Sequence, residues 1–195
     1  MQLHKRDVVD AATAILDNYG IADLTMRRLG RELNVSPGAL YWHFANKQQL
    51  LGAIADRVLE PVHDGHGDWE NRIAGICGRL RDALLSHTDG AELVSASFAA
   101  GQSQAMVQIL GGIAAATADA GVDQPHAELA ARTVVYYVLG FTADEQSRLQ
   151  WDAAGAEMPD EQSALTDDAS KRFGFGLALL VDGIAARRAA VGAAD

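Results

Sequence analysis

The chain has 195 residues, of which 49% are apolar and 22% charged. This composition can bury a core and predicts a globular protein, not a disordered one. The net charge of −10 is unevenly spread, because residues 1–60 carry 7 basic and 7 acidic side chains and the remainder carries the whole excess. Since salt screens charges beyond about 8 Å, the N-terminal part can still approach phosphates while an acidic remainder would repel them.

The first periodic segments predict α-helices. Apolar residues spaced 4, 3 and 4 apart over residues 8–19 form one helix face, and Gly20 ends that helix. Thr25 is a good N-cap for a second helix. Asn34, which tolerates the left-handed conformation, ends it. Ser36 then caps a short third helix over about residues 37–44, with proline at its first position.

A fourth helix begins at Asn46, where Gln49 completes a capping box, and Pro61 ends it. The polar stretch 63–68 predicts a loop, which we take as the boundary between a part over 1–60 and a part over 61–195. Asp89 with Glu92 reads as a further capping box. Helical stripes follow the loop, and one long exposed loop interrupts them: the stripes cover about 69–84, 102–120, 126–146 and 168–190, and the loop covers 148–169.

The segment 126–146 is apolar nearly all round, which predicts a helix buried on all sides. No alternating strand pattern, glycine-rich phosphate loop or internal repeat is present. The predicted fold class is therefore all-α: an N-terminal three-helix domain with a helix-turn-helix, followed by a C-terminal helical domain.

The most informative segment is residues 24–44, in which two short helices flank a tight turn at 34–36. This is the helix-turn-helix pattern, in which the second helix enters the major groove of DNA. The small residues at 36–39 let the backbone approach the groove closely. Tyr41, Trp42 and His43 would project outward to reach phosphates or base edges, and Lys47 with the N–H groups after Asn46 would clamp a second phosphate.

The sequence LTMRRLGRELNVSPGALYWHFANKQQLL, residues 24–51, resembles the DNA-binding domain of TetR-type repressors, closest in pattern to the tetracycline-repressor type. The hallmark Leu-Tyr-x-His-Phe, followed by a polar pair and lysine, is carried by residues 40–47. Weaker matches to the C-terminal ligand-binding domain follow in order at 80–85, 89–91, 139–140, 145–146 and 173–177. The resemblance implies a homodimeric repressor that binds a near-palindromic operator and a small-molecule effector.

The resemblance also implies which residues touch DNA. Together with Arg28 and Ser36, which the helix pattern places beside them, the expected DNA-binding residues are Thr25, Arg27, Arg28, Ser36, Pro37, Gly38, Ala39, Tyr41, Trp42, His43 and Lys47. Pro37 and Ala39 depart from the type, which has glutamine and threonine there. We therefore expect sparse hydrogen bonding to bases and an operator read partly through thymine methyls, Arg27 and DNA shape.

The expected effector pocket combines matched positions with neighbouring apolar residues: His63, Ile76, Leu80, Val94, Phe98, Met106, Ile109, Leu110 and Tyr136. Val94 and Phe98 stand where the type has the histidine and arginine that anchor chelated magnesium, and of the polar set only His63 and Asp144 remain. The sequence thus predicts a largely apolar effector and no response to a tetracycline–magnesium complex. The apolar pocket residues could equally be plain core.

The family's four-helix dimer interface implies self-association through the last two helices, for which we expect Val134, Tyr137, Phe141, Phe173, Leu177, Leu180 and Ile184. These residues could instead pack inside one protomer. Arg27 and Arg28 could be a solvated face, and the aromatics at 41–43 an ordinary amphipathic stripe.

Other function classes have less support. An enzyme would need converging acid, base or nucleophile groups; His43 and His87 have no evident partner, so we predict no catalytic site and no cofactor. His63, Asp64, His66 and Asp68 read as a polar linker in which no metal is expected. Cys77, the single cysteine, reads as a buried hydrophobe. A helical dimer that binds a ligand or protein without DNA remains an alternative.

The location is expected to be cytoplasmic. No apolar run approaches the roughly 20 residues that a membrane span needs. Asp7, Asp10 and Asp17 interrupt the N-terminal segment as no signal peptide would allow.

Overall fold

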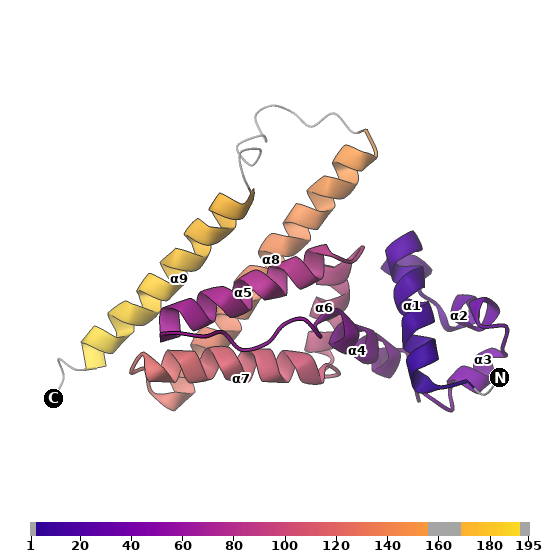
Figure 1. Cartoon of the computed structure of the whole chain (residues 1–195), viewed down its shortest axis with the longest axis horizontal. Helices are drawn as coiled ribbons and strands as arrows, with labels where there is room; N and C mark the ends of the chain where they lie inside the picture. The colour runs from indigo at the N-terminus through magenta and orange to yellow at the C-terminus, as the bar shows by residue number, and fades with distance from the viewer. Residues whose placement is uncertain (1–2, 156–168, 192–195) are drawn as a thin grey trace. The chain divides into compact units, whose positions relative to one another are not determined.

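The computed structural model describes residues 3–155 and 169–191, which are helical and contain no β-strand (Figure 1). This confirms the predicted all-α class. The helices within these residues, in chain order, are α1 (Lys5–Tyr19), the 3-10 turn η1 (Ile21–Asp23), α2 (Met26–Glu32), α3 (Pro37–Leu40), α4 (Lys47–Val58), α5 (Trp69–Leu85), α6 (Gly90–Ala99), α7 (Gln104–Asp119), α8 (Gln124–Ala153) and α9 (Ala169–Val191).

The N-terminal helices begin and end where local chemistry predicts. Gly20 ends α1 with φ +76°, a conformation that few side chains tolerate. Thr25 caps α2, its hydroxyl accepting the Arg28 N–H at 3.1 Å. Asn46 caps α4, its side-chain oxygen accepting the Gln49 N–H at 2.8 Å. Each cap satisfies a backbone donor that the first helical turn leaves unpaired.

The chain forms two compact units that are not continuous in sequence. Unit 1 contains the residues up to Pro61 together with Asp82–Val107, and unit 2 contains Val62–Arg81 together with the residues from Gln108 onward. The predicted division between residues 60 and 61 lies beside the first crossing between units. The other two crossings fall inside α5 and α7, so the end of α5 and all of α6 associate with the N-terminal helices.

Unit 1 is held together by an apolar core that α1 and α4 share with the short helices. Its fully buried side chains include Val8, Leu16, Leu24, Leu29, Leu40, Phe44, Leu50 and Ile54. The helix α4 also packs on α6. A carboxylate fastens this second contact: Asp56 Oδ1 accepts from the Ser103 hydroxyl at 2.7 Å and from the Ala105 N–H at 3.0 Å. Asp56 therefore ties α4 to the beginning of α7.

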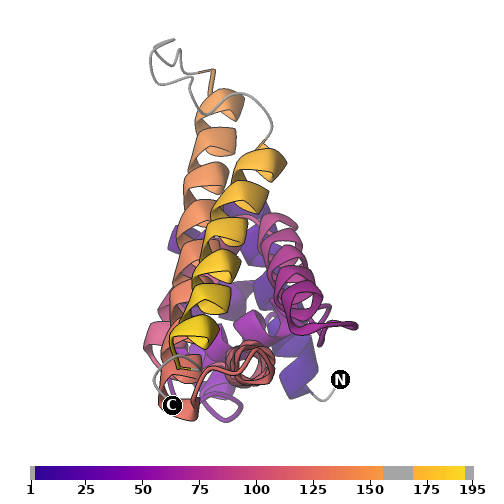
Figure 2. The same cartoon turned by 90° about the vertical axis from the view of Figure 1, so that its left-hand side faces the viewer.

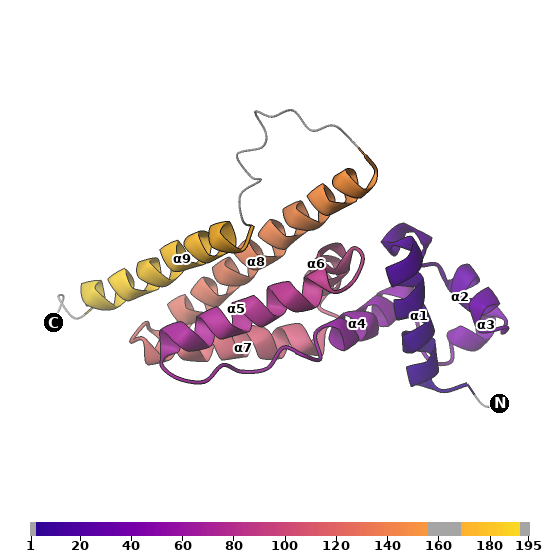
Figure 3. The same cartoon turned by 45° about the horizontal axis from the view of Figure 1, so that its top comes forward.

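In unit 2, α8 and α9 run side by side (Figure 2). The helix α5 is joined to α7 by the ion pair between Arg72 and Asp119, and Figures 1 and 3 show the two helices next to each other. Tyr137 stacks on Phe173 with 5.6 Å between ring centroids, and its hydroxyl donates to the Phe173 carbonyl at 2.8 Å. Arg81 forms a bidentate pair with Glu145 at 2.6 and 2.9 Å, in which both side chains are largely buried. This pair fixes α5 to α8 by geometry, whereas stability comes mainly from the apolar packing.

Three fold predictions need correction. The helix α3 ends at Leu40, so the expected helix to residue 44 closes as a turn over 41–43. The helix α8 continues to Ala153, and the part of the predicted loop at 148–153 is helical; residues 156–168 of that loop lie outside the described part. Tyr136 is 59% exposed, so α8 is not buried on all sides.

A fourth correction concerns the helix cap predicted at Asp89. This residue has φ +53° and makes no side-chain cap for α6. Its carboxylate instead accepts the N–H of Ile21, 68 positions earlier in the chain.

Candidate DNA-reading head and effector pocket

The turn between α2 and α3 brings the two helices close together. Asn34 has φ +53°, as its residue type allows, and the Val35 N–H bonds back to the Gly30 carbonyl at 2.8 Å. A Cβ on Gly30 would lie 3.0 Å from the Val35 carbonyl oxygen and 3.4 Å from the Pro37 nitrogen. A larger residue than glycine would therefore push the start of α3 away from α2.

The segment from Ser36 to Phe44, which we call the reading segment, separates core from exposed side chains. Leu40 and Phe44 are buried, whereas Trp42 is 90% exposed and Tyr41 is 50% exposed. Ser36 caps α3, its hydroxyl accepting the Ala39 N–H at 3.3 Å. An indole left almost wholly in water adds little to the stability of the fold, so Trp42 is available to contact another molecule.

The expected DNA-binding residues in and around the reading segment differ in how far they are exposed to solvent. Thr25, Arg27, Pro37, Gly38 and Lys47 are exposed, and His43 and Ala39 are partly buried. All of them belong to unit 1, whose core includes Leu40 and Phe44.

Arg28 differs from its neighbour Arg27. Its guanidinium lies 3.7 Å above the Tyr19 ring centroid and pairs with Asp23 at 2.6 Å. Arg28 thus fastens α2 to α1 and η1. Sequence periodicity could not separate the two arginines, because both follow the same N-cap.

A cavity of about 340 Å³ in unit 2 is lined by Val62, His63, Asp64, Ile76, Gln108 and Ile109. The segment carrying His63 is held to α5, since Arg79 donates to the His63 carbonyl at 2.6 and 3.1 Å. A Cβ on Gly112 would meet Asp64 Oδ1 at 2.5 Å and Ile76 Cδ1 at 3.3 Å. Glycine at 112 therefore lets the two sides of the cavity approach α7. The cavity is lined by a carboxylate, an imidazole and an amide beside three apolar side chains.

Of the nine residues predicted for the pocket, the cavity brings together His63, Ile76 and Ile109. Val62, Asp64 and Gln108 were not predicted. Leu80, Val94 and Met106 are buried core, and Phe98 and Leu110 are partly buried. Val94, Phe98 and Met106 belong to unit 1. Tyr136 is exposed on α8.

The residues predicted for the dimer interface lie mainly inside the protomer. Val134, Phe173, Leu177 and Ile184 are buried between the helices of unit 2, and Tyr137, Phe141 and Leu180 are partly buried. The exposed large apolar side chains of the same helices are Leu129, Tyr136, Leu149 and Trp151 on α8 and Phe175 and Leu179 on α9. A groove of about 350 Å³ runs between α8 and α9 beside Leu129, Thr133 and Leu179.

Cys77 is buried on α5, and this burial raises the pKa of its thiol to about 12. At pH 8 only about one native thiol in ten thousand would be thiolate, the reactive form. We expect native protein to resist a thiol reagent at pH 8 and to react as soon as denaturant unfolds it. The unfolded thiol ionises at a lower pH than the folded one, so its ionisation favours unfolding as the pH rises above about 9. Rapid labelling of native protein would contradict this account.

The described residues offer neither a metal cluster nor a membrane span. Among residues 3–155 and 169–191, no three His, Cys, Asp or Glu side chains gather as a metal ion would require. In the same part of the chain, no helix is both long and apolar enough to cross a membrane.

Two families of known proteins match the chain, one in its N-terminal part and one in its C-terminal part. Residues 8–54 match the sequence profile of the tetR family of bacterial regulatory proteins, and residues 60–188 match the tetracyclin repressor-like C-terminal domain. The chain belongs to the TetR family. Both matched regions agree with the resemblance seen in residues 24–51 and in the weaker C-terminal motifs.

Several members of the TetR family are similar over nearly the whole chain. The tetracycline repressor protein class A from transposon 1721 of Escherichia coli is 32% identical, over 97% of this chain and 94% of its own. The crystal structure of Mycobacterium smegmatis BioQ is 61% identical with a TM-score of 0.88, covering 95% of this chain and 99% of BioQ. A structure of BioQ with its double-stranded DNA operator is 58% identical with a TM-score of 0.83, at the same coverage.

Proposed function

We propose that this TetR-family regulator is a homodimeric repressor that a small-molecule effector releases from its operator. The observation that carries the proposal is the reading segment, which presents Tyr41 and Trp42 to solvent while Leu40 and Phe44 anchor it in the core. The similarity to BioQ, which is known with its operator, supports the DNA-binding half. Such a protein would act in the cytoplasm, where the bacterial chromosome is.

We assign DNA contact to residues 1–60, which we call the reading head. Each reading segment would enter a major groove, with half-sites about one helical turn apart on a near-palindrome. The proposed contacts are Thr25, Arg27, Ser36, Pro37, Gly38, Ala39, Tyr41, Trp42, His43 and Lys47. Arg28, which pairs with Asp23 and stacks on Tyr19, is proposed to hold the head together.

We propose residues 1–60 as the DNA-binding part and 61–195 as the effector-binding and dimerisation part. Dimerisation would use the exposed faces of α8 and α9, with Leu129, Tyr136, Phe175 and Leu179 in place of the buried set expected from sequence. Their exposed fractions, between 57% and 68%, leave large apolar surfaces in water unless a second copy covers them.

We propose the cavity beside His63, Asp64 and Gln108 as the effector site. Its size falls in the range of small-molecule sites. The mixed lining supports an effector with an apolar part and groups that donate hydrogen bonds to a carboxylate. This is a more polar ligand than the sequence led us to expect. An effector releases DNA only if it binds the conformation whose head spacing does not fit the operator more tightly than the conformation that binds DNA.

Selection of bound DNA from a random pool, repeated with candidate effectors, tests the proposal. The expected result is one near-palindromic site whose recovery an effector lowers. A chain that selects no DNA but binds small molecules would instead be a helical ligand-binding module. A chain that binds the tetracycline–magnesium complex at submicromolar concentration in calorimetry would contradict our expectation that its anchors are lost.

Two single variants test the assigned contacts of Tyr41 and Lys47. Tyr41→Ala and Lys47→Ala should each weaken operator binding by about 1–3 kcal/mol. Because phosphate contacts carry no sequence information, Lys47→Ala should weaken binding to all sequences and lower the salt slope by about 1. If Tyr41→Ala spares non-specific binding, Tyr41 contacts base edges; if it weakens binding to all sequences, Tyr41 contacts a phosphate. Fluorescence anisotropy at several salt concentrations measures both effects, and unchanged operator affinity would remove that residue from the interface.

A further inference from the structure

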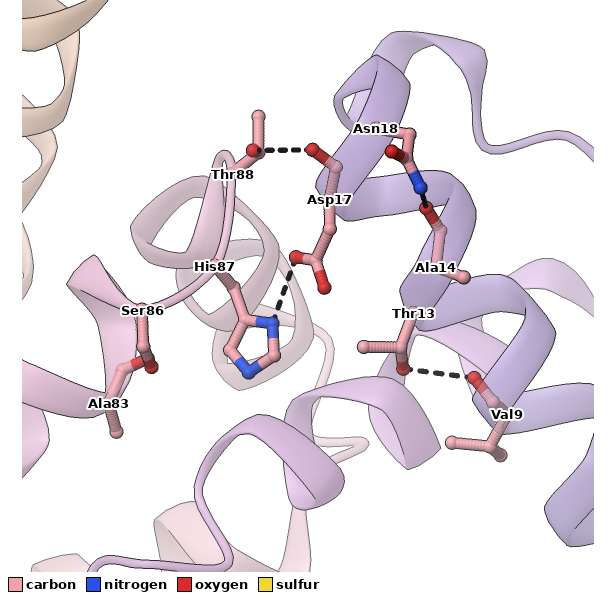
Figure 4. Close-up of polar contacts among 9 residues, drawn as sticks. All are labelled: Val9, Thr13, Ala14, Asp17, Asn18, Ala83, Ser86, His87 and Thr88. Carbon is pink, nitrogen blue, oxygen red and sulfur yellow. Dashed lines mark hydrogen bonds and ion pairs between the residues drawn. The ribbon is translucent and has the colours of Figure 1, made fainter.

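The turn that follows α5 holds the C-terminal end of α1 (Figure 4). His87 Nδ1 lies 2.9 Å from Asp17 Oδ1, and the Thr88 hydroxyl donates to the Asp17 carbonyl at 2.9 Å. The Asp89 carboxylate accepts the Ile21 N–H at 2.9 Å, just beyond the end of α1. Three consecutive residues therefore hold the last turn of α1 and the first residue of η1, and we call these contacts the α1 anchor.

The backbone at the α1 anchor is shaped for this contact. Asp89 has φ +53°, a left-handed conformation that few residues other than glycine, asparagine and aspartate adopt. Its Oδ2 lies 2.6 Å from where a Cβ on Gly20 would stand, so only glycine at 20 admits the carboxylate. Gly20 itself has φ +76°. The Asp89 carboxylate therefore reaches the Ile21 N–H only because Gly20 leaves room for it, which indicates that the position of this end of α1 matters.

The α1 anchor directly follows the helix that also lines the proposed effector cavity. The helix α5 is continuous over Trp69–Leu85, with Ile76 lining the cavity and His87 two residues beyond its end. Two arginines of α5 make further contacts: Arg79 donates to the carbonyl of His63 in the cavity wall, and Arg81 pairs with Glu145 on α8.

We propose that Asp17, His87, Thr88 and Asp89 are positioning residues for operator binding, an inference that rests on the proposed DNA-binding function. They touch no DNA in this proposal. The helix α1 packs on α2 and α4, so holding its end sets the orientation of the reading segment. In a dimer both heads must match one half-site spacing, so a loose anchor lowers affinity and relaxes the spacing requirement.

Conservative pairs of variants provide the test. Asp89→Gly removes the carboxylate but suits the left-handed backbone, and Asp89→Asn keeps an acceptor oxygen at a residue type that tolerates it. Thr88→Val removes the hydroxyl, and Thr88→Ser keeps it. Asp82→Asn, on exposed α5 surface, controls for the loss of one negative charge near DNA. Thermal unfolding of each variant checks the fold.

The measurements are the affinity for the operator selected by wild type and the affinity for the same operator with one base pair inserted between its half-sites. Asp89→Gly and Thr88→Val should each lower operator affinity about 3- to 10-fold, as the loss of one hydrogen bond implies. The penalty for the inserted base pair should shrink in both. Asp89→Asn, Thr88→Ser and Asp82→Asn should behave like wild type.

A wild type that selects an operator while both anchor variants keep its affinity and its full insertion penalty overturns the positioning role alone. Loss of affinity with an unchanged insertion penalty overturns it too, since that pattern reports a weakened fold. A wild type that selects no DNA contradicts the proposed function, and the positioning role falls with it.

Discussion

Replacing Phe175 with glutamate should convert the proposed dimer into monomers and lower operator affinity by more than about 100-fold. Phe175 is 68% exposed on α9, and Leu179, one turn later, is 57% exposed. If these side chains meet their copies, the substitution buries two carboxylates without partners. An uncompensated buried charge costs about 3–5 kcal/mol, and each 1.4 kcal/mol is about tenfold in association.

Sedimentation velocity over a range of protein concentrations measures the dissociation, and anisotropy on the selected operator measures the functional loss. Val107→Glu is the matched control, because Val107 is 61% exposed but lies on α7. It should remain dimeric and bind DNA. A Phe175→Glu chain that stays dimeric at low micromolar concentration would show that α9 is not the interface.

The reading head could be predicted closely because its signals are local. Thr25, Ser36 and Asn46 each cap the helix that directly follows them, and the structure shows all three hydrogen bonds. Only the length of α3 was overestimated. The aromatic run that continues the helical spacing to Phe44 closes as a turn, which a period of four residues cannot distinguish from one more helical turn.

Contacts between distant segments could not be predicted in the same way. Asp89 has the sequence context of a capping box, yet its carboxylate is taken by Ile21, which only the fold brings near. Asp56, which appears as an ordinary surface residue of α4, binds Ser103 and Ala105. A short polar side chain has several possible partners, and the tertiary arrangement selects among them.

The sequence could not say what covers the apolar residues predicted for the pocket and for the dimer interface. Apolar periodicity marks side chains that avoid water, but it does not say whether a cavity, a core or a second chain covers them. Val134 and Tyr136 stand two residues apart on α8, yet the first is buried and the second exposed. Polar lining at Asp64 and Gln108 carries no periodic signal at all.

Substituting alanine for Gly52 should destabilise the fold by about 1–3 kcal/mol, although alanine is the better helix former by about 1 kcal/mol. The added Cβ on α4 would lie 2.3 Å from the Gln102 carbonyl oxygen and 2.9 Å from its carbonyl carbon. These are backbone atoms, which cannot rotate away as a side chain would. The next residue, Ser103, is bonded to Asp56 on α4, so the segment cannot retreat without losing that bond.

Gly52→Ala lowers stability only if the steric clash of the added Cβ costs more than the helix propensity of alanine gains. A second glycine, at which no clash occurs, measures the helix propensity alone. Gly111 lies within α7, is exposed, and has nothing within 4 Å of an added Cβ. Gly111→Ala should therefore stabilise by about 0.5–1 kcal/mol. For a chain of this size, each kcal/mol shifts Tm by about 2–4 °C, so differential scanning calorimetry should place the two variants on opposite sides of wild type. If Gly52→Ala matched Gly111→Ala in raising Tm, the close approach of α4 to residue 102 would be wrong, and with it the account of how α4 is joined to the start of α7.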